Sequence, residues 1–463
     1  MRFVGRKAEL AFLHAQWRKR EAQLIILTGK RRVGKTFLLN HWIQKKPAVY
    51  YMADRRPERE QLRELAKRLG AHFNDPFVAN KGFDDWLEVF AYLKTKVTRR
   101  FALVIDEYPY LAANNPATSS LFQKGWDETL HALPISLVLC GSSIAMMVSE
   151  TLAQAAPLHG RRTGDLLIRP LDFVDVCEFL PKTLAFEERV QVYATLGGMP
   201  GYLTRFDMVN ADLASNVREQ ILTPGAFLFR EVEFLLSEEL REPRNYLAIL
   251  AAIAQGKRKF GEIVNATKLP PTAPKTYLDV LEQLQLVERD VPVTEPMPHK
   301  SKKSLYGLQD PFVALWFEII YPYRSELELG NWHPSIERFR KSLPVMMSRA
   351  YERIARETIR KAEDLPFPVH QVGRWWDHNH EIDVCGINTE TNGLLLGEAK
   401  WSTQPVGADI LAGLQATAPH VRWGNPGRHQ AFALFSKSGF TPDLRRRAKA
   451  EGVLLFQGTR RVV

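Results

Sequence analysis

One short stretch, LIILTGKRRVGKTFLLNHW at residues 24–42, combines residue types that bind phosphate. Residues 29–36 match the pattern GxxxxGK[ST] in full. Glycine lets the backbone pass close to phosphates, and the N–H groups of the loop and of the following helix supply positive potential. Lys35 would reach the β- and γ-phosphates, and the Thr36 hydroxyl would bind Mg²⁺. The sequence therefore predicts an ATP site formed by Gly29, Lys30, Arg31, Arg32, Val33, Gly34, Lys35 and Thr36.

A second stretch, FALVIDEYPYL at residues 101–111, supplies the carboxylates that such a site needs. Asp106 would help to hold Mg²⁺, and Glu107 would polarise the attacking water. A pair of solvated carboxylates at a strand end is the simpler alternative. The phosphate-binding pattern earlier in the chain favours the catalytic interpretation.

A third stretch, ISLVLCGSS, ends in Ser142 and Ser143. One of these hydroxyls could sense the γ-phosphate from a strand next to the one that carries Asp106. A plain helix cap is nearly as typical a use of serine at this position. Both interpretations remain open.

Apolar strands must position these side chains. Leu24–Leu27 and Phe101–Ile105 are continuous apolar runs, as expected for parallel strands that are covered on both faces. The chain from Phe37 onward has the pattern of an amphipathic helix. The order strand, loop, helix predicts an α/β domain with a parallel sheet.

The stretch HEIDVCGINTETNGLLLGEAKWS, residues 380–402, reads as two strands joined by a polar turn. If NTETNG is the turn, Ile387 faces Leu394 and Asp383 lies opposite Glu398. Lys400 shares their face because side chains alternate along a strand. Two carboxylates and a lysine on one face can bind Mg²⁺ and orient or activate a water molecule.

The same counting places Glu381 opposite Lys400. A cross-strand ion pair of this kind contributes only about 0.2–1 kcal/mol, and an exposed face tolerates it. A surface salt bridge is therefore the alternative to a metal site on this hairpin.

The ordered set FVGRKAEL, GKRRVGKT, LVIDEYPYL, LVLCGSS, GRRTG and LGGMPGYL resembles the prokaryotic ATPases called the archaeal ATPase family, relatives of the AAA+ and STAND groups. The resemblance covers roughly the first half of the chain. It implies that Gly5 and Arg6 lie beside the adenine. It also implies that Arg161 and Arg162 can offer charge to the γ-phosphate, in cis or from a neighbouring subunit; a surface or interdomain salt-bridge pair is the alternative for these arginines. Residues 197–203 resemble the small helical lid that follows the nucleotide core.

The C-terminal hairpin resembles the PD-(D/E)xK nuclease superfamily. Its place after the ATPase resembles the C-terminal domain of the same ATPase family. The resemblance implies that Glu352, in MSRAYERIARETI, is a third acidic metal ligand and that Gln415 lies near the site. The chain departs from the pattern at its first motif, which is EID rather than PD.

The middle of the chain changes character near Glu242. Three short helices are predicted at NYLAILAAIAQ, KFGEIVNATK and PKTYLDVLEQLQLVERD, and strands at VPVTE and SLYGLQD flank a basic turn, PHKSKKS. This order is that of a winged helix, which binds DNA by placing its third helix in the major groove. The same fold also serves packing or protein contact. The residues expected to contact DNA are Thr272, Lys275, Thr276 and Tyr277 of the third helix and Lys300, Lys302 and Lys303 of the wing.

Whole-chain properties agree with a multidomain intracellular protein. A length of 463 residues predicts two to four domains, and a formal charge of +11 suits a polyanionic partner such as DNA. The three cysteines are far apart in sequence, which excludes a disulfide framework. No apolar run approaches the roughly 20 residues of a membrane span, and MRFVGRKAEL does not resemble a signal peptide. We therefore expect a cytoplasmic protein with no membrane partner.

The predicted fold class is α/β multidomain: a P-loop parallel sheet with a helical lid, a winged helix and a C-terminal α/β restriction-endonuclease-like domain. The predicted division is 1–175 for the ATPase core, 176–240 for the lid, 241–310 for the winged helix, 311–344 for a bridging segment and 345–463 for the nuclease-like domain. One functional hypothesis is an ATP-hydrolysing switch that positions a DNA-binding module and a metal-dependent nuclease. The other is an ATP-controlled protein-interaction or assembly switch whose C-terminal domain binds without cutting. A homo-oligomer fits either hypothesis.

Overall fold

The computed structural model of the chain describes residues 3–240, 242–270 and 273–463. These residues form two compact units. The first runs to Leu171 and adds Met199–Thr204 and the segment that begins at Glu233. The second contains Asp172–Gly198, Arg205–Val232 and the chain from Glu242 onward.

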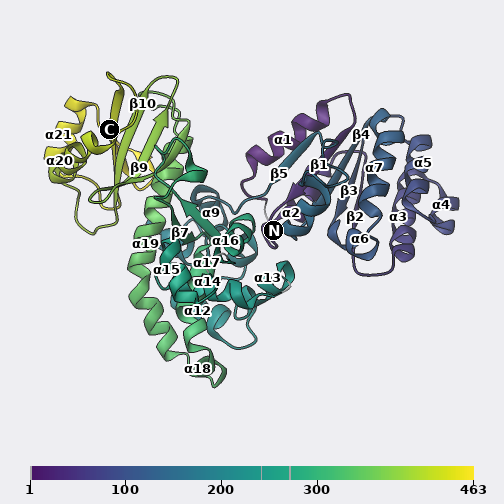
Figure 1. Ribbon diagram of the computed structural model, residues 1–463, viewed down its shortest axis with the longest axis horizontal. Coiled ribbons are helices and arrows are strands. Elements are labelled where there is room, and N and C mark those ends of the chain that lie inside the picture. Colours follow the sequence, from purple (N-terminus) through teal and green to yellow (C-terminus); the bar gives the residue numbers. More distant parts are fainter. Residues whose placement is uncertain (1–2, 241, 271–272) are drawn as a thin grey trace. The chain divides into compact units, whose positions relative to one another are not determined.

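The first unit contains a five-stranded sheet whose strands all run parallel, in the order β2-β3-β4-β1-β5 (Figure 1). The strands are β1 (Gln23–Thr28), β2 (Ala48–Met52), β3 (Phe101–Asp106), β4 (Ile135–Gly141) and β5 (Gly164–Leu167). β1, β3 and β4 are buried along their whole length, as continuous apolar runs require. The predicted parallel sheet is confirmed, and the carboxyl ends of β1, β3 and β4 bring the three predicted functional stretches to one edge.

Helices pack on both faces of this sheet. Leu103 and Ile105 of β3 belong to a core formed with α3, α5 and α7, whereas the alternating residue Val104, also fully buried, points to the opposite face. The helices and helical turns of the first unit are α1 (Lys7–Arg18), α2 (Lys35–Ile43), α3 (Glu58–Phe73), α4 (Pro76–Lys81), α5 (Trp86–Lys96), α6 (Pro109–Asn114), α7 (Thr118–Glu128), η1 (Leu130–Ala132), α8 (Ile144–Met147), η2 (Val148–Leu152), α11 (Pro200–Leu203) and most of α13 (Glu231–Glu239).

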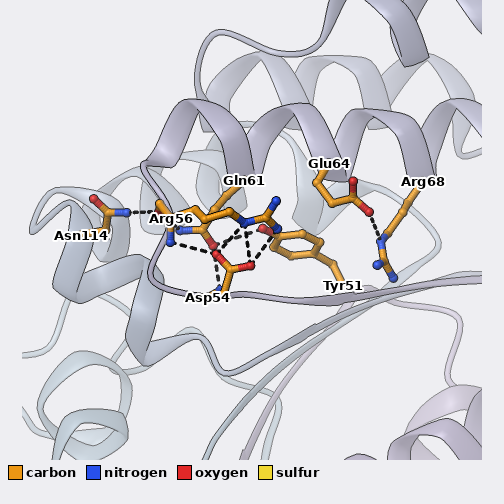
Figure 2. Close-up of polar contacts among 7 residues, drawn as sticks. All are labelled: Tyr51, Asp54, Arg56, Gln61, Glu64, Arg68 and Asn114. Carbon is orange, nitrogen blue, oxygen red and sulfur yellow. Dashed lines mark hydrogen bonds and ion pairs between the residues drawn. The ribbon is translucent and has the colours of Figure 1, made fainter.

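A buried glutamine fixes the loop between β2 and α3, as Figure 2 shows. The Gln61 side chain donates to the Arg56 carbonyl over 2.9 Å and accepts from the Tyr51 hydroxyl and the Asp54 N–H, each over 3.1 Å. Asp54 also pairs with the Arg56 guanidinium, Oδ2 to Nη2 2.7 Å. Because Gln61 lies in the first turns of α3, this network determines where that helix begins next to the sheet.

The second unit is organised around α19 (His333–Lys361), a helix of 29 residues. Glu357 of α19 accepts from the Phe173 N–H over 3.1 Å and from the Tyr193 hydroxyl over 2.9 Å. These contacts attach two helices of the predicted lid, α9 (Phe173–Phe179) and α10 (Phe186–Leu196), to α19. Burial raises the pKa of the Glu357 carboxyl. The sequence-based boundary at residues 344/345 falls inside α19, which continues through Pro344.

The predicted order of three helices and two strands is observed between residues 244 and 308. The elements are α14 (Arg244–Ala254), α15 (Phe260–Thr267), α16 (Ala273–Gln283), β6 (Val287–Asp290) and β7 (Leu305–Leu308), the last two antiparallel. The prediction of a strand at VPVTE is wrong, because the strand ends at Asp290. Pro292 has no N–H for a ladder hydrogen bond. Val293 instead donates its N–H to the Arg374 carbonyl over 2.9 Å, which joins this segment to the C-terminal sheet.

The C-terminal region contains a six-stranded mixed sheet in the order β13-β12-β11-β10-β9-β8. Ile387 pairs with Leu394 across the NTETNG turn, so the predicted hairpin and register are confirmed. α19 contacts β8, β9 and β10, while α20 and α21 contribute to the apolar core of the sheet. The strands are β8 (Gln371–Trp376), β9 (Glu381–Asn388), β10 (Gly393–Lys400), β11 (His429–Ser436), β12 (Leu454–Gln457) and β13 (Arg460–Arg461). The remaining helices and turns of the second unit are α12 (Leu213–Val217), η3 (Arg218–Leu222), η4 (Pro298–Lys300), α17 (Pro311–Ile319), η5 (Tyr321–Tyr323), α18 (Arg324–Glu328), α20 (Ala408–Thr417), η6 (Ala418–His420) and α21 (Pro442–Glu451).

Within the described ranges, no helix combines the length and the apolar composition that crossing a bilayer requires.

Candidate nucleotide and nuclease-like sites

The phosphate loop lies between β1 and α2, as predicted. Gly34 has φ 97° and directly precedes α2, a left-handed conformation that favours glycine. A Cβ atom on Gly29 would lie 2.6 Å from the carbonyl oxygen of Ile168, the residue after β5, so a larger residue would push the loop away from that segment. Gly34 is therefore required by its backbone conformation, and Gly29 by the lack of space for a side chain.

Lys35 is buried in this loop. Its Nζ donates to the carbonyls of Gly29 and Lys30 over 2.7 and 3.1 Å, and to the Ser142 hydroxyl over 3.0 Å. Burial lowers the pKa of Lys35, while Cys140 and the carboxylates of Glu107 and Asp106 oppose that shift. A charged ammonium in this position would interact favourably with phosphate oxygens, which carry full negative charge.

Asp106 lies at the buried end of β3, and its carboxylate accepts three hydrogen bonds. The Thr36 and Tyr50 hydroxyls each donate to its Oδ2 over 2.6 Å, and the Glu107 N–H donates to Oδ1 over 3.0 Å. The structure therefore places the Thr36 hydroxyl oxygen beside a carboxylate oxygen of Asp106, and Mg²⁺ prefers oxygen ligands of these kinds.

Glu107 and Ser142 face each other across neighbouring strand ends. The Ser142 hydroxyl donates to Glu107 Oε1 over 2.6 Å, and its N–H donates to Oε2 over 3.3 Å. Glu107 has φ 55°, a strained backbone conformation for a residue with a side chain. Ser142 thus lies between the buried lysine and the predicted base.

Ser143 contacts a different segment. Its hydroxyl accepts from the Met146 N–H over 3.3 Å, which is the predicted helix cap, and it donates to Glu239 of α13 over 3.1 Å. Glu239 also accepts from the N–H groups of Ile144 and Ala145, and burial raises its pKa. The end of β4 is therefore connected to α13, which the sequence did not predict.

Arg6 supports the phosphate loop from outside. Its guanidinium donates to the Val33 carbonyl over 2.7 Å, to the Arg169 carbonyl over 2.6 Å and to Glu9 over 2.8 Å. Only 6% of Arg6 is exposed. Gly5, which precedes it, has φ 65°. One of its three acceptors, the Val33 carbonyl, belongs to the phosphate loop, and the place of Arg6 beside the adenine stays a prediction.

The other predicted arginines lie in ion pairs or backbone contacts. Arg161 donates to both carboxylate oxygens of Asp127 over 2.9 and 3.0 Å. Arg162 donates to Asp165 over 3.1 Å. Both arginines of GRRTG therefore lie in surface ion pairs, which is the alternative that the sequence suggested. In the loop itself, Arg31 pairs with Glu238, and the Arg32 carbonyl accepts from the Gly201 N–H over 3.1 Å.

A second cluster lies on the C-terminal hairpin. The Ala399 N–H donates to Asp383 Oδ2 over 3.0 Å, and Lys400 Nζ lies 2.7 Å from Glu398 Oε2. Arg356 of α19 donates to the Asp383 carbonyl over 2.9 Å. The structure therefore brings Asp383, Glu398 and Lys400 together on neighbouring strands, next to α19.

Electrostatics in this cluster favour cation binding. Burial, and then repulsion by Asp383, raise the pKa of Glu398 to about 7. Burial and the charge of Asp383 also raise the pKa of Glu352 on α19. Burial opposes the charged form of Lys400, but its hydrogen bond to Glu398 and the charge of Glu398 raise its pKa. A divalent cation between the carboxylates would relieve the repulsion.

The surroundings of this cluster differ in part from the predicted set. Among the described residues, Glu352, Asp383 and Glu398 do not form a group whose ligand atoms all lie within 4.8 Å of one another. Glu381 pairs with Arg374 rather than facing Lys400. Gln415 contacts Glu451 and Arg447 of α21, at 2.8 and 2.7 Å.

Comparison with known proteins identifies the family. Residues 3–206 match a family described as an ATPase domain predominantly from Archaea. An uncharacterized protein of Methanocaldococcus jannaschii, MJECL04, is 33% identical over 402 residues, covering 86% of this chain and 87% of the relative. The chain belongs to the archaeal ATPase family.

Further matches cover other parts of the chain. Residues 316–410 match a family described as archaeal and bacterial proteins of unknown function. A second relative from the same organism, the uncharacterized ATP-binding protein MJ0423, is 52% identical over 44 residues, covering 10% of this chain and 75% of the relative. The Walker-type ATPase PABY2304 of Pyrococcus abyssi has the same fold, with a TM-score of 0.54, 23% identity, and coverage of 68% of this chain and 96% of that chain.

The segment between residues 244 and 308 presents only part of the predicted DNA-contact set. Lys275 and Thr276 are exposed on α16, whereas Tyr277 accepts from the Asn245 amide over 2.9 Å and packs on α14. Lys303 pairs with Glu295 over 2.6 Å. Lys300 and Lys302 are exposed, and Thr272 lies outside the described residues.

Sequence reasoning missed Tyr50 and Glu239 in the nucleotide site. Tyr50 precedes the end of β2, and Glu239 is one of several acidic residues of α13; neither lies in a recognisable motif. Parallel pairing of β2 with β3 could have suggested Tyr50, because Tyr50 pairs with Val104, two residues before Asp106. No sequence signal pointed to Glu239.

Proposed function

We propose that this chain binds and hydrolyses ATP with Mg²⁺ at the carboxyl edge of its parallel sheet. The observation that carries the proposal is the contact chain Lys35–Ser142–Glu107 beside the Thr36–Asp106 pair. Lys35 and the loop N–H groups would bind the phosphates, and the Thr36 and Asp106 oxygens would hold the ion.

The contacts suggest how each residue acts. Mg²⁺, when bound, would neutralise charge that develops on the phosphates. Lys35 would exchange its carbonyl and hydroxyl acceptors for phosphate oxygens. Ser142 would then be released from Lys35, and Glu107 would take the proton of an attacking water molecule. Arg161 or Arg162 could supply further charge, in cis or in trans, only after leaving its present ion pair.

Two substitutions test this proposal separately. Lys35→Ala is expected to abolish tight ATP binding, measured with a fluorescent ATP analogue. Glu107→Gln is expected to keep binding and to lower phosphate release by about 10²-fold or more. Glu128→Gln, on α7, is a control that should change neither quantity. Undiminished turnover in the Glu107→Gln variant would remove Glu107 as the base.

A second activity, metal-dependent cleavage of nucleic acid, is favoured by the C-terminal cluster. Asp383 and Glu398 offer carboxylate oxygens that fit Mg²⁺ or Mn²⁺, and the Lys400 ammonium is held at the same place. When bound, the ion would stabilise the negative charge that develops on a phosphate. Lys400 would orient the attacking water. Glu352, on α19, would be the third acidic ligand of the ion.

Cleavage assays with single-stranded, duplex and branched DNA, and with RNA, test this second activity. With Mn²⁺ present, Asp383→Ala and Glu398→Ala are expected to lose metal binding and cleavage together, while Lys400→Ala loses cleavage and keeps most of the metal. Glu381→Gln is the matched control, because Glu381 lies on β9 but pairs with Arg374. ATP hydrolysis should survive all four changes. Absence of both divalent-ion binding and cleavage would favour the alternative, an ATP-controlled assembly switch whose C-terminal domain binds without cutting.

We also propose that the wing contacts duplex DNA through Lys300 and Lys302, which are exposed. Neutralising both should flatten the dependence of log affinity on log salt by about 0.9 per lost phosphate contact. Lys303→Ala, which removes a lysine that is paired with Glu295, should have a smaller effect. Equal slopes in the double variant and the parent protein would refute the DNA contact.

A further inference from the structure

We propose that Asp377, His380 and His420 form a binding site for one divalent transition-metal ion, of which Zn²⁺ is the best match. Among the described residues, these three form the one group of histidine, cysteine, aspartate or glutamate whose ligand atoms all lie within 4.8 Å of one another. The site is separate from the phosphate loop and from the carboxylates of the hairpin.

Two of the ligands come from the turn between β8 and β9. The Asp377 N–H donates to the His380 carbonyl over 3.0 Å, and Asp377 Oδ1 accepts from the N–H groups of Asn379 and His380, each over 2.8 Å. These bonds hold the carboxylate and the imidazole on the same side of the turn. His380 Nδ1 lies 3.1 Å from Oδ1 and 3.2 Å from Oδ2 of Asp377.

Those separations suit two ligands of one ion. Bonds of about 2.0–2.1 Å at a tetrahedral angle place two ligand atoms about 3.3 Å apart. The hydrogen bond between the two side chains is therefore close to the geometry that they would have around zinc. To bind the same ion, the His380 and His420 rings must turn out of their stacked arrangement, because a metal ion lies in the plane of each imidazole that binds it.

The third ligand comes from a distant part of the sequence. His420 ends η6, between the buried residues Ala418 and Val421, and the Val421 N–H donates to the Ala418 carbonyl over 3.2 Å. Its ring stacks on that of His380, with centroids 4.1 Å apart and planes inclined by 21°. His420 lies outside the β8–β9 turn, so the hydrogen bonds that form that turn do not explain why His420 lies next to His380.

The ligand chemistry selects the metal. Two imidazoles and one carboxylate match zinc and similar transition-metal ions, whereas Mg²⁺ and Ca²⁺ take oxygen ligands. Asp377 and His420 are exposed, so the ion can enter from solvent. Three protein ligands leave at least one coordination position for water or another donor. A bound ion would join the β8–β9 turn to η6, two segments of the C-terminal sheet region that are otherwise far apart in sequence.

The test uses the untagged full-length protein, because a histidine tag would itself bind zinc. Zn²⁺ binding is measured by competition with a chromophoric chelator, and Co²⁺ is added separately to record its visible absorption, which reports ligand geometry. His380→Ala and His420→Ala are each expected to weaken Zn²⁺ binding about tenfold or more and to change the Co²⁺ spectrum. His378→Ala is the matched control, because His378 is exposed in the same turn but is not in the group.

The readouts separate ligand loss from misfolding. Zn²⁺ should raise the melting temperature of the parent protein and of His378→Ala, but not that of His380→Ala or His420→Ala, whose metal-free circular dichroism spectra should match that of the parent. Zn²⁺ affinity that is the same in His380→Ala, His420→Ala and His378→Ala would overturn the proposal. So would a parent protein that binds no zinc in competition with the chelator.

Discussion

Replacing Arg6 by lysine tests which of two roles Arg6 has: holding the phosphate loop in place, or contacting the adenine. The Arg6 guanidinium reaches two backbone carbonyls and one carboxylate, those of Val33, Arg169 and Glu9. A lysine ammonium keeps the charge, but it lacks the planar fork and cannot reach all three acceptors. Losing one charge-assisted hydrogen bond in this buried place costs about 1.5–3 kcal/mol. For a unit of this size, about 2 kcal/mol lowers the melting temperature by about 4–8 °C.

Calorimetry and nucleotide binding together measure the effect of Arg6→Lys. The transition of the nucleotide-free protein should move down by that amount, while Arg20→Lys, at an exposed position, should leave it unchanged. Binding of ATP requires the phosphate loop in its folded conformation. If the variant must spend about 1.4 kcal/mol of binding free energy to reach that conformation, the Kd for ATP rises about tenfold, and the Kd for GTP rises by the same factor. An unchanged melting temperature with an altered preference between ATP and GTP would refute support of the loop and favour the adenine contact.

Three further predictions follow from buried polar contacts. Tyr50→Phe removes a donor to Asp106, so the Mg²⁺ concentration needed for half-maximal ATP hydrolysis should change while ATP-independent folding persists; an unchanged Mg²⁺ requirement would show that Tyr50 is only structural. Gln61→Ala leaves the Arg56 carbonyl and the Asp54 N–H without their partner, which should cost about 1–3 kcal/mol in urea unfolding, and a loss below about 0.5 kcal/mol would contradict this. Burial and repulsion by Asp383 raise the pKa of Glu398 to about 7, so between about pH 4.5 and pH 7 the folded state holds a proton that the unfolded state releases. In metal-free protein, the free energy of unfolding should fall across that window relative to that of Glu398→Gln, and parallel pH profiles would contradict it.

Local patterns were sufficient to predict much of the fold. The strand, loop and helix around Lys35 are contiguous in sequence, and the buried strand that ends in Asp106 is a continuous apolar run; both were predicted and are observed. The C-terminal hairpin was predictable because its turn sets the register, and a shift of one residue would turn Asp383 and its neighbours to the other face. The first of the two strands between residues 287 and 308 was misplaced, because VPVTE has an extended pattern but Pro292 has no N–H for a ladder hydrogen bond. The strand that pairs with β7 is Val287–Asp290.

The sequence by itself indicated candidate side chains for phosphate and Mg²⁺, because those motifs are short and their spacing is set by one turn or one strand. Only the tertiary structure decided which distant groups complete each site. Arg6 contacts Val33 across 27 residues of the chain, Glu239 contacts Ser143 across 96, and His420 contacts His380 across 40. Such meetings depend on how helices and strands pack, and packing is governed by the apolar faces of whole elements rather than by the polar residue that each one carries.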